Sequence, residues 1–185
     1  DYRTLTEPAM DMTQAMFLSA GSHHFCVYTV DGRVRCWGGN DRGQQDYAPY
    51  NAPYDWASVP TARPMARNAI GPLQDPTLLT TGRSNTCIVL ANDPTKVRCW
   101  GQNTAGQADP TSDELTQYGT DSAGFDDAGV NAPDIIDIDM GHATGCAVLE
   151  DRNLNNGYDV YCWGDLRRGL IGDGSAWVKT WPPPR

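Results

Sequence analysis

The chain has 185 residues, 39 % of them hydrophobic, so it can bury a core, and its length suggests a single domain over residues 1–185. Its formal charge of −9 and pI near 4.6 argue against nucleic acid and anionic membranes as partners, because both require a basic surface. No apolar run approaches the length of a membrane span and no signal peptide is visible, so we expect Asp1 to be a mature terminus.

Residues 1–15 are polar and contain Pro8, which predicts an extended lead-in strand that completes a neighbouring sheet. From residue 16 onward, one sequence pattern occurs three times. Its core reads HFCVYTVDGRVRCWGGNDRGQ over 24–44, TCIVLANDPTKVRCWGQNTAGQ over 86–107 and GCAVLEDRNLNNGYDVYCWGDLRRGL over 145–170. Successive CWG motifs are 63 residues apart, and a fixed period of this size indicates a repeat architecture.

Each copy opens with a short segment that ends in a glycine five residues before the first cysteine. These segments are MFLSAG at 16–21, TLLTTG at 77–82 and DIDMG at 137–141, with Leu18, Leu79 and Ile138 at the equivalent apolar position. We expect each segment to be a strand that leads into a two-stranded hairpin. Each repeat then has three strands, and a fourth is expected in the segment that links it to the next.

The hairpin of the first copy can be derived from its turn. Asp31-Gly32 lies between two runs of alternating β-favouring residues, which is a strong hairpin signal. A three-residue loop over 30–32, with Gly32 in the left-handed conformation, sets the pairing of the two strands. The predicted pairs are Thr29–Arg33, Tyr28–Val34, Val27–Arg35 and Cys26–Cys36.

The six cysteines are therefore expected to pair within their own copies. The other two hairpins have 11 and 15 residues between their cysteines instead of 9, and these even insertions keep the thiols opposed if the tip is lengthened symmetrically. We predict the disulfides Cys26–Cys36, Cys87–Cys99 and Cys146–Cys162. A zinc site is the competing interpretation, but no CxxC pair is present. Three bridges require an oxidising compartment, so we expect a secreted or cell-surface protein.

The segment after the first copy is rich in aromatic residues and proline. Within YAPYNAPYDW, the candidate binding residues are Tyr47, Tyr50, Tyr54 and Trp56. They either pack against the edge of their own repeat or form a binding surface, since rigid aromatic side chains contribute contact area at a small entropic cost.

The segment over residues 108–139 is acidic and holds no basic residue. It contains Asp109, Asp113, Glu114, Asp121, Asp126, Asp127, Asp134, Asp137 and Asp139. A solvated acidic loop is the default interpretation, and calcium binding is the alternative, although no regular calcium-loop pattern supports it. In the proline-rich tail, Trp177 and Trp181 belong either to the core or to a contact with another chain.

Nothing in the sequence indicates catalysis. His23, His24 and His142 do not recur at a common position, and no hydrolase, metalloprotease, phosphate-loop or dinucleotide motif occurs. Paired cysteines are unavailable as nucleophiles. We therefore expect a protein that is not an enzyme and that has neither a cofactor nor a catalytic metal.

The string G-x-x-x-x-C followed by xDGxVxCWGxNxxGQ resembles the regulator of chromosome condensation repeat family, and in particular its cysteine-bearing version in exported bacterial proteins. The likeness covers roughly residues 16–44, 77–107 and 137–174, and the third copy departs from it where Gly169-Leu170 replaces Gly-Gln. The resemblance implies an all-β propeller in which each repeat forms one four-stranded blade. The expected boundaries are 16–76, 77–136 and 137–185, the last including the tail.

The resemblance also implies roles for the repeat-core residues. The tryptophans of the CWG motifs would pack between blades, and the glycines would allow close backbone approach at turns. These residues are Trp37, Gly38, Gly43, Trp100, Gly101, Gly106, Trp163, Gly164 and Gly169. The family includes a nucleotide exchange factor, a photoreceptor and a secreted β-lactamase inhibitor, and no functional residue of these can be transferred to this chain.

Three repeats are too few for a closed ring, since propellers have about four to eight blades. An arc of three blades would leave two apolar blade faces open. The chain is then a fragment, part of a ring completed by other copies, or a unit of a filament. We expect a structural or adhesive protein that forms a homo-oligomer or filament. The alternative is a module that binds a partner protein or a glycan through its aromatic loop.

Overall fold

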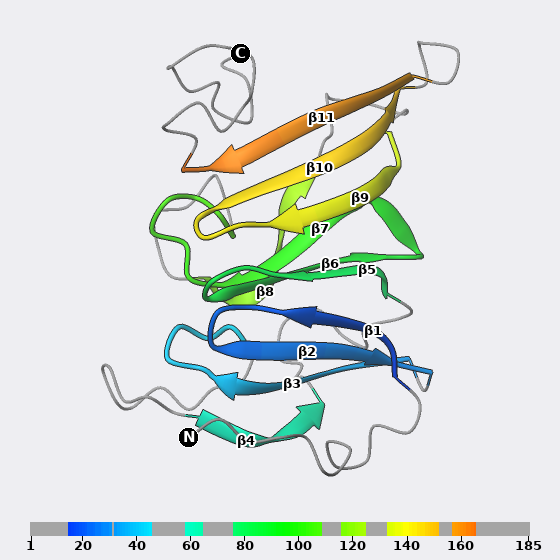
Figure 1. The fold of residues 1–185 in the computed structure, drawn as a ribbon. Coiled ribbons are helices and arrows are strands. Elements are labelled where there is room, and N and C mark those ends of the chain that lie inside the picture. The colour runs from blue at the N-terminus through cyan, green and yellow to red at the C-terminus, as the bar shows by residue number, and fades with distance from the viewer. Residues whose placement is uncertain are drawn as a thin grey trace.

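A computed structural model shows three antiparallel β-sheets stacked face to face along the chain (Figure 1). It describes residues 15–30, 32–45, 58–64, 76–108, 116–124, 133–151 and 157–165. Each sheet corresponds to one sequence copy and is called a blade here. The described part of the chain contains no helix, so the expected all-β class is confirmed.

The first two blades have four strands each. Blade 1 consists of β1 (Ala15–Ala20), β2 (His24–Thr29), β3 (Arg33–Gly39) and β4 (Ser58–Pro64), paired in that order. Blade 2 consists of β5 (Pro76–Thr81), β6 (Asn85–Leu90), β7 (Asp93–Gly101) and β8 (Thr116–Gly124), also paired in chain order. In both blades the fourth strand comes from the linking segment, as expected.

Blade 3 is described as three strands, β9 (Ile135–Met140), β10 (Thr144–Asp151) and β11 (Gly157–Gly164). In all three blades the short strand entering the glycine pairs with the first strand of the hairpin. The lead-in segment over 1–14 lies outside the described residues.

The hairpin registers follow the prediction in two blades and depart from it in one. In blade 1 the pairing runs from His24↔Gly38 to Thr29↔Arg33, and Gly32 has the left-handed φ of 75° that the loop requires. In blade 3 the register is unshifted over the whole hairpin.

The tip of the second hairpin does not lengthen symmetrically. Its register holds as far as Val89↔Val97 and then shifts, so that Leu90 pairs with Asp93. Pro94 follows directly, and a proline has no N–H with which to continue a regular ladder. The Asp93 carboxylate instead accepts a hydrogen bond from Thr95 Oγ1 at 3.0 Å and lies 3.4 Å from Lys96 Nζ.

The three cysteine pairs predicted from the hairpins are the three that the structure bridges. The disulfides are Cys26–Cys36, Cys87–Cys99 and Cys146–Cys162, and the described residues include no free cysteine. Their Cα atoms are 4.1–4.2 Å apart, near the short spacing of about 4.5 Å at non-hydrogen-bonded positions of an antiparallel pair. The even insertions therefore leave the cysteines opposed, including in the irregular second hairpin.

Alternation along the strands gives every blade two chemically different faces. We call one the cystine face, because it carries the disulfide and the valine two residues before the second cysteine. We call the other the tryptophan face, because it carries the tryptophan of the CWG motif and the residue that follows the first cysteine. The cystine face of blade 1 packs on the tryptophan face of blade 2, and the cystine face of blade 2 packs on the tryptophan face of blade 3.

Candidate functional site

The two joints between blades contain the hydrophobic core. The first joint buries Cys26, Tyr28, Val34 and Cys36 of blade 1 against Ile88, Leu90 and Trp100 of blade 2. The second joint buries Cys87, Val89, Val97 and Cys99 of blade 2 with Ile135, Ile138, Leu149 and Trp163 of blade 3. The first two disulfides are thus core elements between blades as well as staples within their hairpins.

Each joint is also fixed by a hydrogen bond from the tryptophan. The Trp100 indole Nε1–H donates to the Gln44 main-chain oxygen at 2.9 Å, and Trp163 Nε1–H donates to the Gln107 main-chain oxygen at 2.9 Å. Donor and acceptor are 56 residues apart in both joints. The indole N–H of one blade thereby binds the last residue of the CWGxNxxGQ string of the preceding blade.

The polar residues of that string shape the turn that presents the carbonyl. In blade 1, Asn40 Oδ1 accepts a hydrogen bond from Gln45 N at 3.0 Å, and Gln44 Oε1 accepts one from Arg42 N at 2.9 Å. In blade 2, Asn103 Oδ1 accepts from Ala108 N and Gln107 Oε1 accepts from Ala105 N, both at 2.8 Å. The Asn and Gln of the motif therefore hydrogen-bond within their own turn, and the tryptophan of the next blade donates to a backbone oxygen.

The first glycine of the first two copies lies where the backbones of neighbouring blades approach each other closely. A Cβ atom on Gly21 would lie 2.4 Å from the Gly82 carbonyl oxygen, and one on Gly82 would lie 2.5 Å from the Gly141 carbonyl oxygen. A Cβ on Gly141 would meet only the Thr144 oxygen of its own blade, at 3.6 Å. A Cβ on either of the first two glycines would also lie within 2.6 Å of the His24 or Asn85 side chain of its own blade, whereas no described blade approaches the third.

The first joint contains a buried polar network that the sequence pattern did not reveal. His24 is fully buried, and its Nε2 lies 2.9 Å from Thr86 Oγ1, which itself donates to the Gln44 main-chain oxygen at 2.8 Å. Because the single hydroxyl hydrogen of Thr86 is used on Gln44, His24 Nε2 must carry the hydrogen of its bond. The Gln44 oxygen accepts from both Thr86 and Trp100, so both of its lone pairs are used.

The protonation state of His24 follows from this environment. Its Nδ1 is buried and has no hydrogen-bond partner, so the neutral ring fits the site. Burial is the main cause that lowers the pKa of His24, to about 4, and the nearby His23 lowers it further, while Asp41 opposes the shift.

The second joint lacks an equivalent network. Asn85 occupies the position of His24, and Gly145 occupies the position of Thr86. The Asn85 side-chain amide is buried without a hydrogen-bond partner. A Cβ on Gly145 would lie within 2.5 Å of Trp163 ring atoms, so the glycine makes room for the indole.

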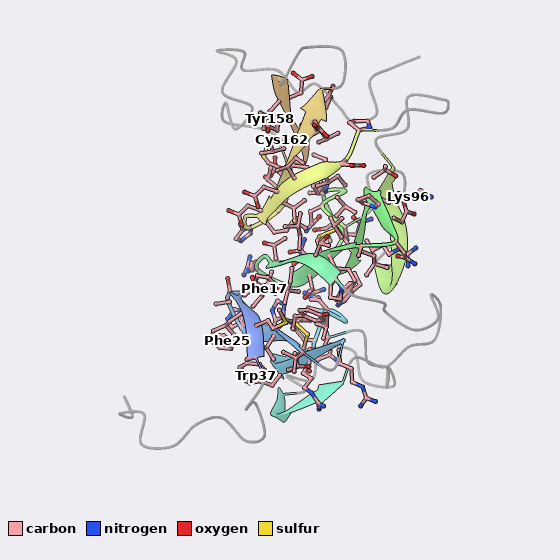
Figure 2. The ribbon with its side chains drawn as sticks, turned by 90° about the vertical axis from the view of Figure 1, so that its right-hand side faces the viewer. Phe17, Phe25, Trp37, Lys96, Tyr158 and Cys162 are labelled. Carbon is pink, nitrogen blue, oxygen red and sulfur yellow. A yellow bond between two sulfur atoms is a disulfide. The ribbon has the colours of Figure 1, made fainter. Side chains whose placement is uncertain are left out.

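The outer tryptophan face, on blade 1, has no described blade against it. The resemblance implied that Trp37 packs between blades, but no described blade lies against it, and Trp37 is partly exposed whereas Trp100 and Trp163 are each 1 % exposed. Leu18 is 66 % exposed and Phe25 40 %. The Phe25 ring stacks on Trp37 with ring centres 5.4 Å apart, and Figure 2 shows the two side by side on blade 1.

The outer cystine face, on blade 3, is open in the same way. Val160 is 67 % exposed, whereas its equivalents Val34 and Val97 are 1 % and 0 % exposed. Tyr158 is exposed, and the Cys146–Cys162 bridge is partly exposed while the other two bridges are buried. Figure 2 places Tyr158 and Cys162 at the opposite end of the stack from Phe25 and Trp37.

Comparison with known proteins agrees with this architecture. The family model of the regulator of chromosome condensation (RCC1) repeat matches residues 17–44. Yeast RCC1 (Prp20), solved with Kap60 bound, superposes with a TM-score of 0.62 at 18 % identity, over 85 % of this chain and 31 % of that one. The chain folds as RCC1-type propeller blades.

Two further structures show the same RCC1-type fold. Prp20p from Saccharomyces cerevisiae, reported with its binding properties to Gsp1p and histones, matches with a TM-score of 0.62 at 18 % identity, over 89 % of this chain and 33 % of that one. Human WBSCR16 matches with a TM-score of 0.59 at 16 % identity, over 84 % and 36 %. The chain therefore spans about a third of the length of the structures that it matches.

Several residues singled out in the sequence lie outside the described part. These are Tyr47, Tyr50, Tyr54, Trp56, Gly169, Trp177, Trp181 and the acidic positions from Asp109 to Asp127, apart from Asp121 in β8. The glycines Gly38, Gly43, Gly101, Gly106 and Gly164 all adopt positive φ at their turns.

The described carboxylates of the acidic segment have structural partners. Asp139 Oδ1 lies 3.3 Å from Thr80 Oγ1 across the second joint, and Asp137 Oδ1 accepts a hydrogen bond from Ile138 N at 2.9 Å. Among the residues that the structure describes, no group of three His, Cys, Asp or Glu side chains could hold a metal ion. No helix of the described residues is long and apolar enough to cross a membrane.

Proposed function

We propose that this chain is a non-enzymatic structural or adhesive protein of an oxidising, extracellular compartment that assembles end to end with copies of itself into an oligomer or filament. One observation carries the proposal. Several positions that are buried in the internal joints are more exposed on the two outer faces, as Val160 is beside Val34 and Val97, although Val27 of the outer tryptophan face is 1 % exposed.

The energetics favour covering these faces. Full burial of a large apolar side chain contributes roughly 1.5–3 kcal/mol, and Leu18, Phe25, Val160 and Tyr158 are all exposed. Association costs roughly 4–15 kcal/mol of translational and rotational freedom. A contact that buries several such side chains with good packing can exceed this cost, so the assembly should depend on protein concentration.

Three disulfides in a chain of this size support an extracellular setting, because such bridges persist in oxidising compartments and are rare in the reducing cytosol. The acidic surface supports a partner that is neither nucleic acid nor an anionic membrane. We propose no catalytic role, since neither a recurring catalytic group nor an unpaired thiol occurs in the described residues.

The test is the native mass of the purified protein across a concentration series, with electron microscopy at the highest concentration. We expect oligomers or fibres in the wild type, and mostly monomer for Leu18→Asp and for Val160→Asp. Val30→Asp is the matched control, because Val30 is 54 % exposed at a hairpin tip and its equivalent Ala91 is also exposed. A wild-type protein that remains monomeric at every concentration would contradict the proposal.

A binding module is the second candidate. It is favoured by the stacked, exposed Phe25–Trp37 pair, since aromatic anchors dominate many protein contacts. Two solved structures of the same fold are reported with bound or tested protein partners. The glycan alternative depends on Tyr47, Tyr50, Tyr54 and Trp56. A monomer that is retained on a sugar resin, and released when Tyr50 and Tyr54 are changed to alanine, would favour a glycan ligand.

A further inference from the structure

We propose that the assembly is polar, meaning head to tail. The outer cystine face of one copy packs on the outer tryptophan face of a second copy, so that the contact repeats the internal joints. This inference rests on the proposed self-association and specifies its geometry. The occupant of each face is therefore a second copy of this chain. The argument starts from continuity with the two joints already present within the chain.

Gly141 provides the first step. A Cβ on Gly21 or Gly82 would collide with the carbonyl of the next blade, at 2.4 and 2.5 Å, and also with the His24 or Asn85 side chain of its own blade. Gly141 does not have a positive φ, and the space around its missing Cβ is open within the described structure. An alanine would fit there in an isolated chain. The glycine becomes necessary when a blade of a second copy packs on blade 3 in the way that blade 3 packs on blade 2. The Gly21 carbonyl of the second copy would then lie beside Gly141, as the Gly141 carbonyl lies beside Gly82 within the chain.

Trp37 provides the second step. Its equivalents Trp100 and Trp163 each donate an indole hydrogen bond to a main-chain oxygen of the preceding blade. Among the described residues Trp37 has no corresponding bond, so its donor is available to an incoming blade. The acceptor in both joints is a backbone atom, a group that every residue carries.

The polar groups at the two faces provide the third step. In the first joint His24 bonds to Thr86, and a joint between copies would bring Thr144 and Phe25 to these two positions. Phe25 has no polar side-chain atom, and Thr144 Oγ1 already donates to the Asp165 main-chain oxygen at 2.8 Å. Joining the faces would therefore leave no unsatisfied polar atom buried on either side chain. The free-energy cost of such a buried atom would otherwise oppose association.

A symmetric contact fits the same groups less well. Two tryptophan faces placed together would oppose two indole donors and leave both without the backbone acceptor that the internal joints use. The head-to-tail contact instead uses a different surface on each copy. Such a contact closes into a ring or continues as a filament, depending on the rotation between copies.

Gly141→Ala is the decisive variant. We expect it to fold with three disulfides and an unchanged melting temperature, but to remain monomeric at concentrations where the wild type assembles. Gly82→Ala is the matched comparison, because its Cβ would collide inside an existing joint and should lower the melting temperature. Trp37→Phe keeps an aromatic ring to stack on Phe25 but removes the indole donor and part of the apolar surface, so it should weaken association at least roughly fivefold to tenfold.

Mixing two monomeric variants tests the polarity directly. Gly141→Ala retains an intact tryptophan face, and Leu18→Asp retains an intact cystine face. An equimolar mixture should form a heterodimer that neither variant forms alone. If the wild type assembles but Gly141→Ala assembles equally well, or if the mixture stays monomeric, the polar contact is wrong while self-association stands. If the wild type itself never assembles, the proposed function fails and this inference fails with it.

Discussion

His24 of the first blade and Thr86 of the second, 62 residues apart, are joined by a hydrogen bond of 2.9 Å between Nε2 and Oγ1. The bond continues from Thr86 to the Gln44 carbonyl, which also accepts from Trp100. Thr86 and Trp100 thus converge on one backbone oxygen, and His24 joins this network through Thr86. This arrangement makes the stability of the first joint sensitive to pH and to single-atom changes.

The protein should lose stability as the pH falls below neutrality. The pKa of His24 is lowered to about 4 in the folded state, from an ordinary value of 6.5, so the unfolded chain binds the proton more readily. The contribution of His24 is therefore fully present above pH 6.5 and is lost as the pH falls towards 4. The total difference is roughly 3 kcal/mol.

Urea unfolding between pH 4.5 and 7.5 measures this dependence. His24→Gln cannot titrate and keeps an N–H donor, so its stability should change little over the same range. Equal slopes in the wild type and in His24→Gln would contradict the assignment.

Removal of the Thr86 hydroxyl should destabilise the first joint. Thr86→Val has nearly the same shape but leaves the His24 Nε2–H without its acceptor, at a cost of roughly 1–3 kcal/mol. Thr95→Val is the comparison, since Thr95 bonds to Asp93 at a partly buried hairpin tip, and we expect a change of about 0.5 kcal/mol or less there. Denaturant midpoints of the two variants should therefore differ clearly.

The three tryptophans of the CWG motifs should respond differently to the same substitution. Trp100→Phe and Trp163→Phe each leave a buried carbonyl short of a donor and should cost roughly 1–3 kcal/mol. Trp37→Phe should change the monomer by about 0.5 kcal/mol or less, because its indole N–H makes no such bond. Similar losses at all three positions would mean that Trp37 is part of a joint within the monomer.

The third disulfide should be the first to be reduced. Cys146 and Cys162 are partly exposed on the outer cystine face, whereas the other four cysteines are buried between blades. Brief treatment with a mild reductant under native conditions, followed by alkylation and peptide mapping, should label these two residues first. Removing a bridge that closes a loop of this length should cost roughly 3 kcal/mol. Early labelling of Cys87 and Cys99 would contradict the burial order.

Much of each blade was predictable because its determinants are local. The Asp31-Gly32 turn set the register of the first hairpin, and the parity of the insertions predicted which cysteines face each other. The prediction failed at Pro94, where a missing N–H interrupts the ladder and the irregular tip absorbs the extra residues. The fourth strands were expected in the linking segments, although not their residues, since these segments carry no repeated pattern.

The sequence by itself determined the repeat, the hairpin registers of the first and third blades and the pairing of the six cysteines, because these depend on the period-two alternation of neighbouring residues. Only the tertiary structure decided which residues meet across a joint. The acceptor for each tryptophan is a backbone carbonyl, a group that every residue carries, so no side-chain pattern marks it. The same stacking decided that Trp100 and Trp163 are buried while Trp37 is not, since that difference depends on whether another blade lies against the face.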